Sequence, residues 1–295
     1  MKNWKTVEII RGLEGNHNMK ILVTGANGYL GQGVVKHLLD CGHYVIAADF
    51  NVDYVDERAE RIACDLFLIT DNPYEYFKEP DVLLHLAWRD GFVHYSDAHI
   101  NDIPKHYNFI KLFAESKVSK IVVMGSMHEI GFFEGSIKED TPCNPTTPYG
   151  ISKNALRELT AMFCKQKGKL FQWLRGYYIV SNSKYGSSIF SKISAAEFEG
   201  KTKFPFTMGL NQFDFIDYED FCEQVVRATT QDEILGIINI CTGRPERLAD
   251  RVERFIKENG YKIKLKYGAF PDRPYDSKAV WGDSSKIEAI MNNKT

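Results

Sequence analysis

Tyr149 and Lys153 are the residues whose types and spacing point most directly to chemistry. They lie four residues apart in PTTPYGISK, so on a helix their side chains share one face. An ammonium group beside a phenol stabilises the phenolate, brings the phenol pKa toward working pH and makes tyrosine usable as an acid and base. Ser126, at the end of the apolar run IVVMGS, could hydrogen-bond the same substrate oxygen. An isolated Tyr-x-x-x-Lys is more often a solvated helix face, but with the upstream serine we predict a catalytic set of Ser126, Tyr149 and Lys153.

A glycine-rich turn near the start of the chain indicates which ligand would lie next to this catalytic set. In ILVTGANGYLG (21–31), Gly25, Gly28 and Gly31 follow an apolar run and precede a helical pattern. Glycine permits a tight turn, close approach of the backbone to a pyrophosphate and close helix–strand packing, and the helix N-terminus favours the anion. Asp49 ends the next apolar run, where a carboxylate can accept both ribose hydroxyls and repel a 2′-phosphate. We therefore predict NAD rather than NADP as the cofactor. The alternative for the three glycines is a flexible turn without a ligand, and the alternative for Asp49 is an ordinary turn residue.

The elements that must position these residues alternate along the first half of the chain. Strand-like apolar runs at 21–24, 44–49, 82–86 and 120–124 are separated by segments of helical spacing. Strands that are apolar on both faces belong in a parallel sheet covered by helices, and Gly42 is a plausible end for the first helix. The predicted fold class is therefore α/β, a doubly wound parallel Rossmann sheet with a smaller C-terminal substrate-binding lobe.

The predicted domain organisation has three parts. Residues 19–176 form the NAD-binding Rossmann domain, to which the chain returns around 213–244, and 177–295 form mainly the substrate-binding lobe. Beyond about residue 175 the alternation loosens, with a helix expected at 187–199 and strands at 213–216 and 237–240. Residues 1–18 are predicted to be an N-terminal extension, to which we assign no chemistry.

Composition excludes several classes of function. The chain has 295 residues, 44% of them hydrophobic, and 37 basic against 39 acidic residues give a formal charge of −2. This balance favours neither nucleic acid nor a membrane surface as partner. The six cysteines contain no Cys-x-x-Cys pair, and no secretory signal or long apolar span is present, so we expect a cytoplasmic protein with reduced thiols and no metal site.

Three motifs together resemble the extended short-chain dehydrogenase/reductase family. They are the Gly-x-x-Gly-x-x-Gly spacing of the turn, Cys64-Asp65-Leu66 and Leu86-Ala87-Trp88. In that family the Asp65 position meets the adenine amino group, and Leu86-Ala87 matches the small-residue turn after the fourth strand. The cofactor-binding residues that the pattern and the resemblance imply are Gly25, Gly28, Tyr29, Leu30, Gly31, Asp49, Asp65, Leu66, Leu86, Ala87, Tyr149 and Lys153.

The second half of the chain resembles the nucleotide-sugar branch of this family, which comprises NAD-dependent epimerases and dehydratases. The stretches that carry the resemblance are FDFIDYEDF (213–221), NICTG (239–243), RPYD (273–276) and GDSSK (282–286). They imply a nucleoside diphosphate sugar as substrate, with Trp88, Ser126, Tyr178 and Arg273 as substrate-binding residues. Arg273 is the expected pyrophosphate ligand, since a guanidinium matches phosphate oxygens with two hydrogen bonds; the alternative is a surface ion pair with Asp272 or Asp276.

The departures from the family pattern also matter. Phe213 stands where the family has a second arginine, and Tyr178 stands where the family has an asparagine. The contacts to the diphosphate are therefore expected to differ from those of the family. Met127-His128 stands where 4,6-dehydratases carry Asp-Glu, which argues against dehydration. His128 falls where some epimerase-reductases present a proton-transfer group, and histidine suits that role; alternatively it only hydrogen-bonds loop backbone.

Three further histidines are expected to be polar helix or loop residues without metal-ligand spacing. They are His94, His99 and His106.

The function predicted from these patterns is that of an NAD(H)-dependent oxidoreductase acting at a hydroxyl or ketone of a nucleotide sugar, at C4. Whether it is a 4-epimerase or a 4-ketoreductase/dehydrogenase stays open. Two alternatives are a reductase of a non-nucleotide ketone and a catalytically silent NAD-sensing protein. Since family members pair through helices flanking the active site, we expect a homodimer formed by the segments around 109–113 and 156–163.

Overall fold

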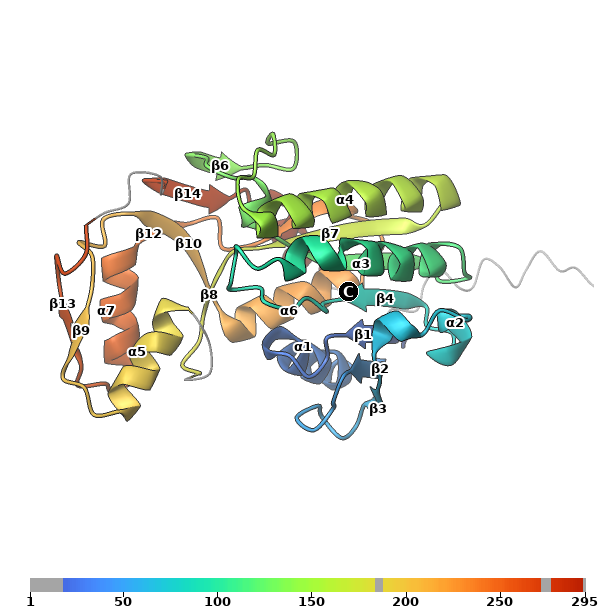
Figure 1. The fold of residues 1–295 in the computed structure, drawn as a ribbon, viewed down its shortest axis with the longest axis horizontal. Coiled ribbons are helices and arrows are strands. Elements are labelled where there is room, and N and C mark those ends of the chain that lie inside the picture. The colour runs from blue at the N-terminus through green and yellow to red at the C-terminus, as the bar shows by residue number, and fades with distance from the viewer. Residues whose placement is uncertain (1–17, 184–187, 272–276, 294–295) are drawn as a thin grey trace, which may run out of the picture.

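The computed structural model describes residues 18–183, 188–271 and 277–293. Residues 1–17 of the predicted N-terminal extension and Arg273 therefore lie outside the described residues. Figure 1 shows a large body of sheet and helices beside a smaller lobe, which holds α5, α7, β9 and β13.

The large body is built on a seven-stranded parallel sheet. Its strand order is β11-β7-β5-β4-β1-β2-β3. The central strands are almost wholly buried because both faces are covered, which is why their sequences are continuous apolar runs. The strands are β1 (Lys20–Thr24), β2 (Tyr44–Asp49), β3 (Glu60–Ala63), β4 (Val82–His85), β5 (Lys120–Ser126), β7 (Leu170–Gly176) and β11 (Gly236–Ile240).

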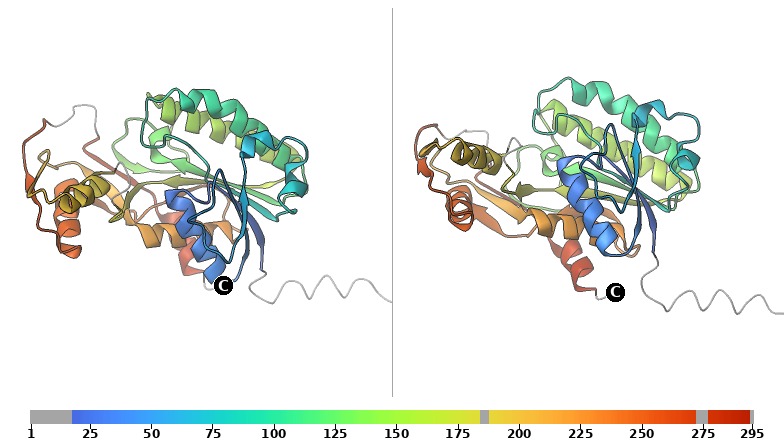
Figure 2. Two further views of the ribbon diagram at one scale, coloured as in Figure 1. Left: turned by 60° about the horizontal axis from the view of Figure 1, so that its bottom comes forward. Right: turned by 90° about the horizontal axis from the view of Figure 1, so that it is seen from below.

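Helices cover both faces of this sheet. On one side α1 (Tyr29–Asp40), α6 (Tyr218–Thr229) and α8 (Ser285–Asn292) pack together, and on the other α3 (Ala98–Ala114) lies along α4 (Pro148–Lys167), as Figure 2 shows. The short α2 (Pro73–Tyr76) packs beside α3. Two separate buried apolar clusters result, one on each side of the sheet.

The order of the strands fixes where a ligand can bind. The chain builds the sheet outward from β1 through β2 to β3, then crosses to β4 and continues through β5 and β7 in the other direction. In such sheets the ligand crevice lies at the carboxyl ends of the strands where the order reverses. Here that place is between β1 and β4, where Thr24 and His85 are in register.

The smaller lobe has its own apolar core and a second sheet. That sheet has the order β12-β10-β14-β6, with β8 also pairing to β10, and β9 pairs with β13. Phe190, Phe206, Val252 and Phe255 are among its buried core residues. The elements outside the seven-stranded sheet and its helices are β6 (Gly135–Ile137), β8 (Tyr178–Val180), α5 (Ile189–Phe198), β9 (Lys203–Pro205), β10 (Gln212–Asp217), β12 (Pro245–Arg247), α7 (Leu248–Glu258), β13 (Lys264–Lys266) and β14 (Ala279–Gly282). Of these, β6 and β14 pack against the main body through Ile137 and Val280.

The predicted fold class is confirmed. The strand expected at 120–124 continues two residues further, so Ser126 is the last residue of β5, and the helix expected at 187–199 begins at Ile189. Gly42 follows the end of α1 with φ +84°, a backbone conformation that glycine adopts without strain.

Two further sequence-based expectations can be compared with the structure. All six cysteines are free thiols. Among the described residues, no helix combines the length and apolar character needed to cross a bilayer.

Candidate active site

The glycine turn forms a cradle at the carboxyl end of β1. Gly25 has φ +71°, and a Cβ on it would lie 2.7 Å from the backbone of Ala87; a Cβ on Gly31 would lie 2.2 Å from the carbonyl oxygen of Gly25. Neither position admits a side chain. The backbone of the turn is therefore not covered by side chains at Gly25 and Gly31, and it lies close to the end of β4. The residues present therefore fit a dinucleotide, whose pyrophosphate needs this close approach to the start of α1.

Two carboxylates stand along the same crevice. Asp49 ends β2 and accepts hydrogen bonds from the backbone N–H groups of Asn27 (2.9 Å) and Phe50 (2.7 Å). Asp65 caps the short 3₁₀ helix η3 (Leu66–Leu68) by accepting from the Phe67 N–H at 3.0 Å. Backbone donors thus fix both carboxyl groups at the wall of one cavity, where the sequence predicts contacts to ribose and adenine.

The structure brings the predicted catalytic residues to this same cavity. Its volume of about 2130 Å³ exceeds the few hundred to about 1000 Å³ typical of a single small-ligand site. Its lining includes the predicted cofactor-binding and catalytic residues together with Trp88 and Tyr178. One crevice is therefore large enough for a dinucleotide and a second ligand.

Local capping explains how Tyr149 and Lys153 reach the crevice. The Thr147 hydroxyl accepts from the Gly150 N–H (3.2 Å), Pro148 begins α4, and the Tyr149 N–H donates to the carbonyl oxygen of His94 (3.1 Å). The first turn of α4 is thereby tied to the loop after β4. Tyr149 and Lys153 are both buried on the face of α4 that looks onto the end of β5.

The electrostatics of the pair differ from the sequence-based expectation. Burial raises the pKa of Tyr149 to about 12, although hydrogen bonding to Ser126 opposes the rise. Burial also lowers the pKa of Lys153 to about 7. The lysine Nζ donates to the carbonyl oxygen of Met124 at 2.8 Å and lies 3.9 Å from the centre of the Trp88 ring. The protein alone therefore does not lower the phenol pKa. The expected stabilisation of the phenolate combined the ammonium group with an oxidised nicotinamide, whose positive charge would act in that direction.

Three histidines, His94, His99 and His128, pack against the Tyr149 ring. The imidazole of His94 stacks on the phenol with 5.0 Å between centroids and 8° between planes, and His128 packs edge-on against His94 at 4.5 Å. Burial lowers the pKa of His128 to about 4 and also lowers the pKa of His94. Both side chains are thus neutral near pH 7, so His128 is not an imidazolium donor there. Its proton-transfer role stays a prediction.

His99 and His106 are buried rather than simply polar. Trp88 Nε1 donates to His99 Nδ1 at 3.1 Å, and the indole stacks on His106 at 4.7 Å. His106 Nδ1 in turn lies 2.8 Å from His85 Nε2, and His85 Nδ1 lies 2.8 Å from the Thr24 hydroxyl. Sequence reasoning missed this cluster because helical spacing does not reveal that α3 turns these histidines toward β4. The cluster supports Trp88, and through it Lys153.

Aromatic side chains form the lobe side of the cavity. Tyr178 packs on Phe213 (4.7 Å) and lies 6.2 Å from His128, and Phe215 completes the group at 5.9 Å from Tyr178. The sequence positions at which the family pattern has asparagine and arginine thus present rings here. The predicted pyrophosphate ligand, Arg273, lies outside the described residues.

Three of the family-like stretches meet at one buried carboxylate. Asp214, from FDFIDYEDF, accepts hydrogen bonds from the backbone N–H groups of Thr242 (2.8 Å), Gly243 (2.9 Å) and Gly282 (3.2 Å). It therefore joins the NICTG and GDSSK stretches where the lobe meets the main body. In this structure these motifs position the lobe.

The comparisons with known proteins agree with this geometry. Residues 21–241 match the family model described as the NAD dependent epimerase/dehydratase family. The chain belongs to this family, which confirms the resemblance seen in its motifs.

Particular relatives narrow the comparison. The chain is 43% identical over 269 residues to dTDP-6-deoxy-L-talose 4-dehydrogenase (NAD(+)) of Aggregatibacter actinomycetemcomitans, covering 90% of this chain and 99% of that protein. It is 25% identical to the putative UDP-arabinose 4-epimerase 4 of Arabidopsis thaliana, over 92% of this chain and 71% of that protein. Among solved structures, UDP-N-acetylglucosamine 4-epimerase from Methanobrevibacter ruminantium M1 superposes with a TM-score of 0.80 at 21% identity, covering 93% of this chain and 92% of that one.

Proposed function

We propose that the protein is an NAD(H)-dependent 4-dehydrogenase or 4-ketoreductase of a nucleotide-activated 6-deoxy sugar, transferring one hydride per turnover. The observation that carries the oxidoreductase chemistry is the single cavity that holds the glycine turn, Asp49 and the three residues Ser126, Tyr149 and Lys153. The 43% identical relative, which matches almost end to end, supports the substrate class and the net redox outcome.

The prediction of NAD as cofactor is confirmed by the relative whose name specifies NAD(+). In this chain the bare turn at Gly25 and Gly31 would receive the pyrophosphate, Asp49 the adenosine ribose and Asp65 the adenine. NAD supplies the acceptor or donor of the hydride.

We assign each catalytic residue a role. Tyr149 takes the proton from the C4 hydroxyl during oxidation and returns it during reduction, and Ser126 hydrogen-bonds the same oxygen. Lys153, held by Met124 and Trp88, provides a positive charge on the same helix face. His128 and Tyr178 border the substrate side of the cavity.

The proposal assigns the smaller lobe to substrate binding. The main body would hold the cofactor, and the lobe would close the far side of the sugar through the Tyr178, Phe213 and Phe215 rings. The family and its 43% identical member establish an enzyme, so the NAD-sensing alternative is set aside.

The decisive assay separates a dehydrogenase from an epimerase. Purified protein with NAD⁺ and dTDP-6-deoxy-L-talose should form NADH in proportion to the sugar oxidised, measured by absorbance. A 4-epimerase would interconvert the C4 epimers with no net NADH, and product analysis of the same mixture would reveal it. UDP-glucose and a simple cyclic ketone serve as comparison substrates. Turnover of the free ketone alone would favour a non-nucleotide ketone reductase.

We further propose that the enzyme is a cytoplasmic homodimer that pairs through the outer side of α3 and α4. Phe109, Phe113 and Leu156 are buried against the sheet, whereas Ile151 and Met162 on α4 are exposed. Light scattering at micromolar concentration should give twice the chain mass, and Ile151→Lys should give the monomer mass. A monomeric parent protein would contradict the proposal.

A further inference from the structure

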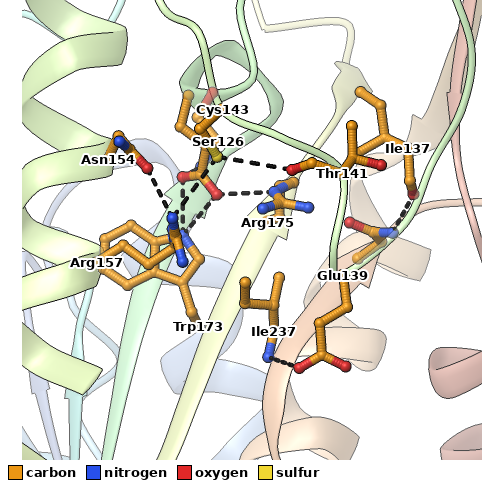
Figure 3. Close-up of polar contacts among 12 residues, drawn as sticks. Ser126, Ile137, Glu139, Thr141, Cys143, Asn154, Arg157, Trp173, Arg175 and Ile237 are labelled. Atoms are coloured by element: carbon orange, nitrogen blue, oxygen red, sulfur yellow. Dashed lines mark hydrogen bonds and ion pairs between the residues drawn. The ribbon is translucent and has the colours of Figure 1, made fainter. Parts of the chain in front are cut away.

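A carboxylate with no assigned role lies directly behind the predicted catalytic serine. Glu129 ends the 3₁₀ helix η4 (Met127–Glu129), which begins one residue after Ser126, and its side chain is 0% exposed. Figure 3 shows Trp173 and Arg175 of β7 beside Ser126. Trp173 Nε1 donates to the Glu129 carboxylate at 2.8 and 3.0 Å, and Arg175 Nε donates to it at 2.7 Å. A buried charge needs such partners because its loss of solvation is costly.

The carboxylate also takes part in fixing the backbone of Ser126. The Ser126 N–H donates to Glu129 Oε2 at 3.4 Å, and the Ser126 hydroxyl oxygen accepts from the His128 N–H at 3.3 Å. The two bonds form a reciprocal capping box around the start of η4. Because the hydroxyl oxygen accepts from backbone, its own hydrogen can point toward Tyr149, with which Ser126 also forms a hydrogen bond.

The Trp173 indole packs against Gly125, the residue before Ser126. A Cβ on Gly125 would lie 2.0 Å from Trp173 Nε1, so only glycine lets the indole reach Glu129. The two strands are in register here, with Gly125 opposite Arg175 and Ser126 opposite Gly176. The last two residues of β5, Gly125 and Ser126, are thus held between the neighbouring strand β7 and the carboxylate.

The charges around Glu129 include the predicted catalytic pair. Lys153 and Tyr149 lie on α4, which packs against η4. Burial has the largest effect on the pKa of each group, and the negative charge of Glu129 contributes an upward shift to both. Arg175, also 0% exposed, faces it from β7 and donates through Nη1 to the carbonyl oxygen of Lys138 at 3.1 Å. Cys143 and Tyr177 are the other titratable groups that its charge influences, and Arg157 approaches Cys143 at 3.6 Å.

We propose that Glu129 is a positioning residue of the catalytic centre, which fixes Ser126 together with Trp173 and places a negative charge beside the start of α4, the helix that carries Lys153. The inference rests on the proposed function for the roles of Ser126, Tyr149 and Lys153. A well-packed apolar side chain would fill the same space at no cost in solvation. The negative charge of Glu129 pairs with the buried guanidinium of Arg175 at 2.7 Å, and it also offsets part of the burial of Lys153.

The test is Glu129→Gln, which keeps the shape and an acceptor oxygen but removes the charge. Glu139→Gln is the matched control, because Glu139 bonds the Ile237 N–H at 3.1 Å and pairs with Lys286 at the surface. We expect Glu129→Gln to lower kcat about tenfold to a hundredfold, with NAD⁺ affinity by calorimetry within about twofold of the parent. The control should match the parent in both measurements.

A second readout reports the charge and needs no turnover. In protein with ¹³C-labelled lysine, the Lys153 signal, assigned with Lys153→Met, should titrate near 7 in the parent. The groups around Lys153 other than Glu129 are Tyr149, His85 and His106, and burial keeps both histidines neutral at this pH. Loss of the Glu129 charge should lower the Lys153 midpoint by roughly one pH unit, since a cation loses its nearby anion.

The outcomes separate this inference from the proposed function. An unchanged kcat, or a lower kcat with an unchanged Lys153 midpoint, would overturn the inference. If the parent turns over no nucleotide sugar, the proposed function fails while the Lys153 titration still decides about Glu129.

A milder variant covers the case in which Glu129→Gln does not fold. Trp173→Phe removes one donor to the carboxylate and leaves every charge in place. It should lower kcat about threefold to tenfold with NAD⁺ affinity retained, and a parent-like kcat in this variant would overturn the inference.

Discussion

The ammonium nitrogen of Lys153 lies 3.9 Å from the centre of the Trp88 indole ring. A buried cation against the face of an indole is stabilised by the ring quadrupole, and the stabilisation is greatest where water is excluded. Trp88 is itself held by His99 and by stacking on His106. The turn after β4 therefore determines where the predicted catalytic lysine can hold its charge, which leads to the first prediction.

Trp88→Leu should keep the fold and lower kcat. Losing the cation–π contact removes on the order of 0.5 to 2 kcal/mol of stabilisation from the Lys153 ammonium, so kcat should fall about threefold to thirtyfold. The loss should be greater at pH 8 than at pH 6, because the variant loses the lysine charge at a lower pH. Steady-state kinetics at both pH values check this, with Trp281→Leu, outside the cavity lining, as control. An equal loss at both pH values would contradict the charge argument.

Tyr149→Phe should retain NAD binding and lose at least a hundredfold in kcat, because the phenol moves the proton and contributes little to dinucleotide affinity. Calorimetry with NAD⁺ and NADH-formation kinetics measure the two properties separately. Tyr107→Phe, on α3 and packed against Phe163, is the matched control. Turnover near the parent value in Tyr149→Phe would remove Tyr149 from the mechanism.

Asp49→Asn should weaken NAD⁺ binding about tenfold. It should also bring the affinities for NAD⁺ and NADP⁺ closer together. The charged acceptor of the ribose hydroxyls is replaced by a neutral one, and the repulsion of a 2′-phosphate disappears. Binding constants for both dinucleotides provide the measurement. Asp53→Asn changes an exposed carboxylate four residues away and should leave both constants unchanged. Stronger binding of NADP⁺ than NAD⁺ by the parent protein would refute the role of Asp49.

Lys153→Met should abolish turnover while changing how stability depends on pH. The pKa of Lys153 is lowered by burial to about 7, below the 10.5 of an exposed lysine, so the unfolded chain binds more protons between these values. In the parent, the depressed lysine pKa does not reduce the free energy of unfolding above pH 10.5. As pH falls from 10.5 toward 7, the free energy of unfolding decreases by up to about 1.4 kcal/mol per pH unit. The methionine variant lacks that decline.

Denaturant unfolding of the cofactor-free parent and variant between pH 7 and 10 measures this difference. The variant should gain stability relative to the parent as pH falls through this range, and the gain should level off below 7. Lys165→Met, exposed on the same helix, should follow the parent. Parallel curves for parent and Lys153→Met would show that the lysine is not depressed in the folded protein.

Part of the fold follows from local sequence. The apolar runs, the glycine turn and the acidic residue ending the second run identify a Rossmann sheet and its NAD edge, because these depend on period, turn chemistry and spacing along one segment. The second sheet was not predicted, because it assembles short strands such as β6, β10 and β14 from segments more than sixty residues apart. Strands of three or four residues such as β6 and β14 carry too little pattern to be found locally, whereas the six-residue β10 contains the strand expected at 213–216.

The same division applies to the candidate site. The sequence by itself determined that Tyr149 and Lys153 share a helix face and that Ser126 ends a strand, since both follow from the geometry of single elements. Only the tertiary structure decided that Lys153 points to Met124 and Trp88, that His94 stacks on the phenol, and that Glu129 is buried behind Ser126. Burial and neighbouring charge set the pKa of each of these groups, and both are created by segments that meet only when the chain folds.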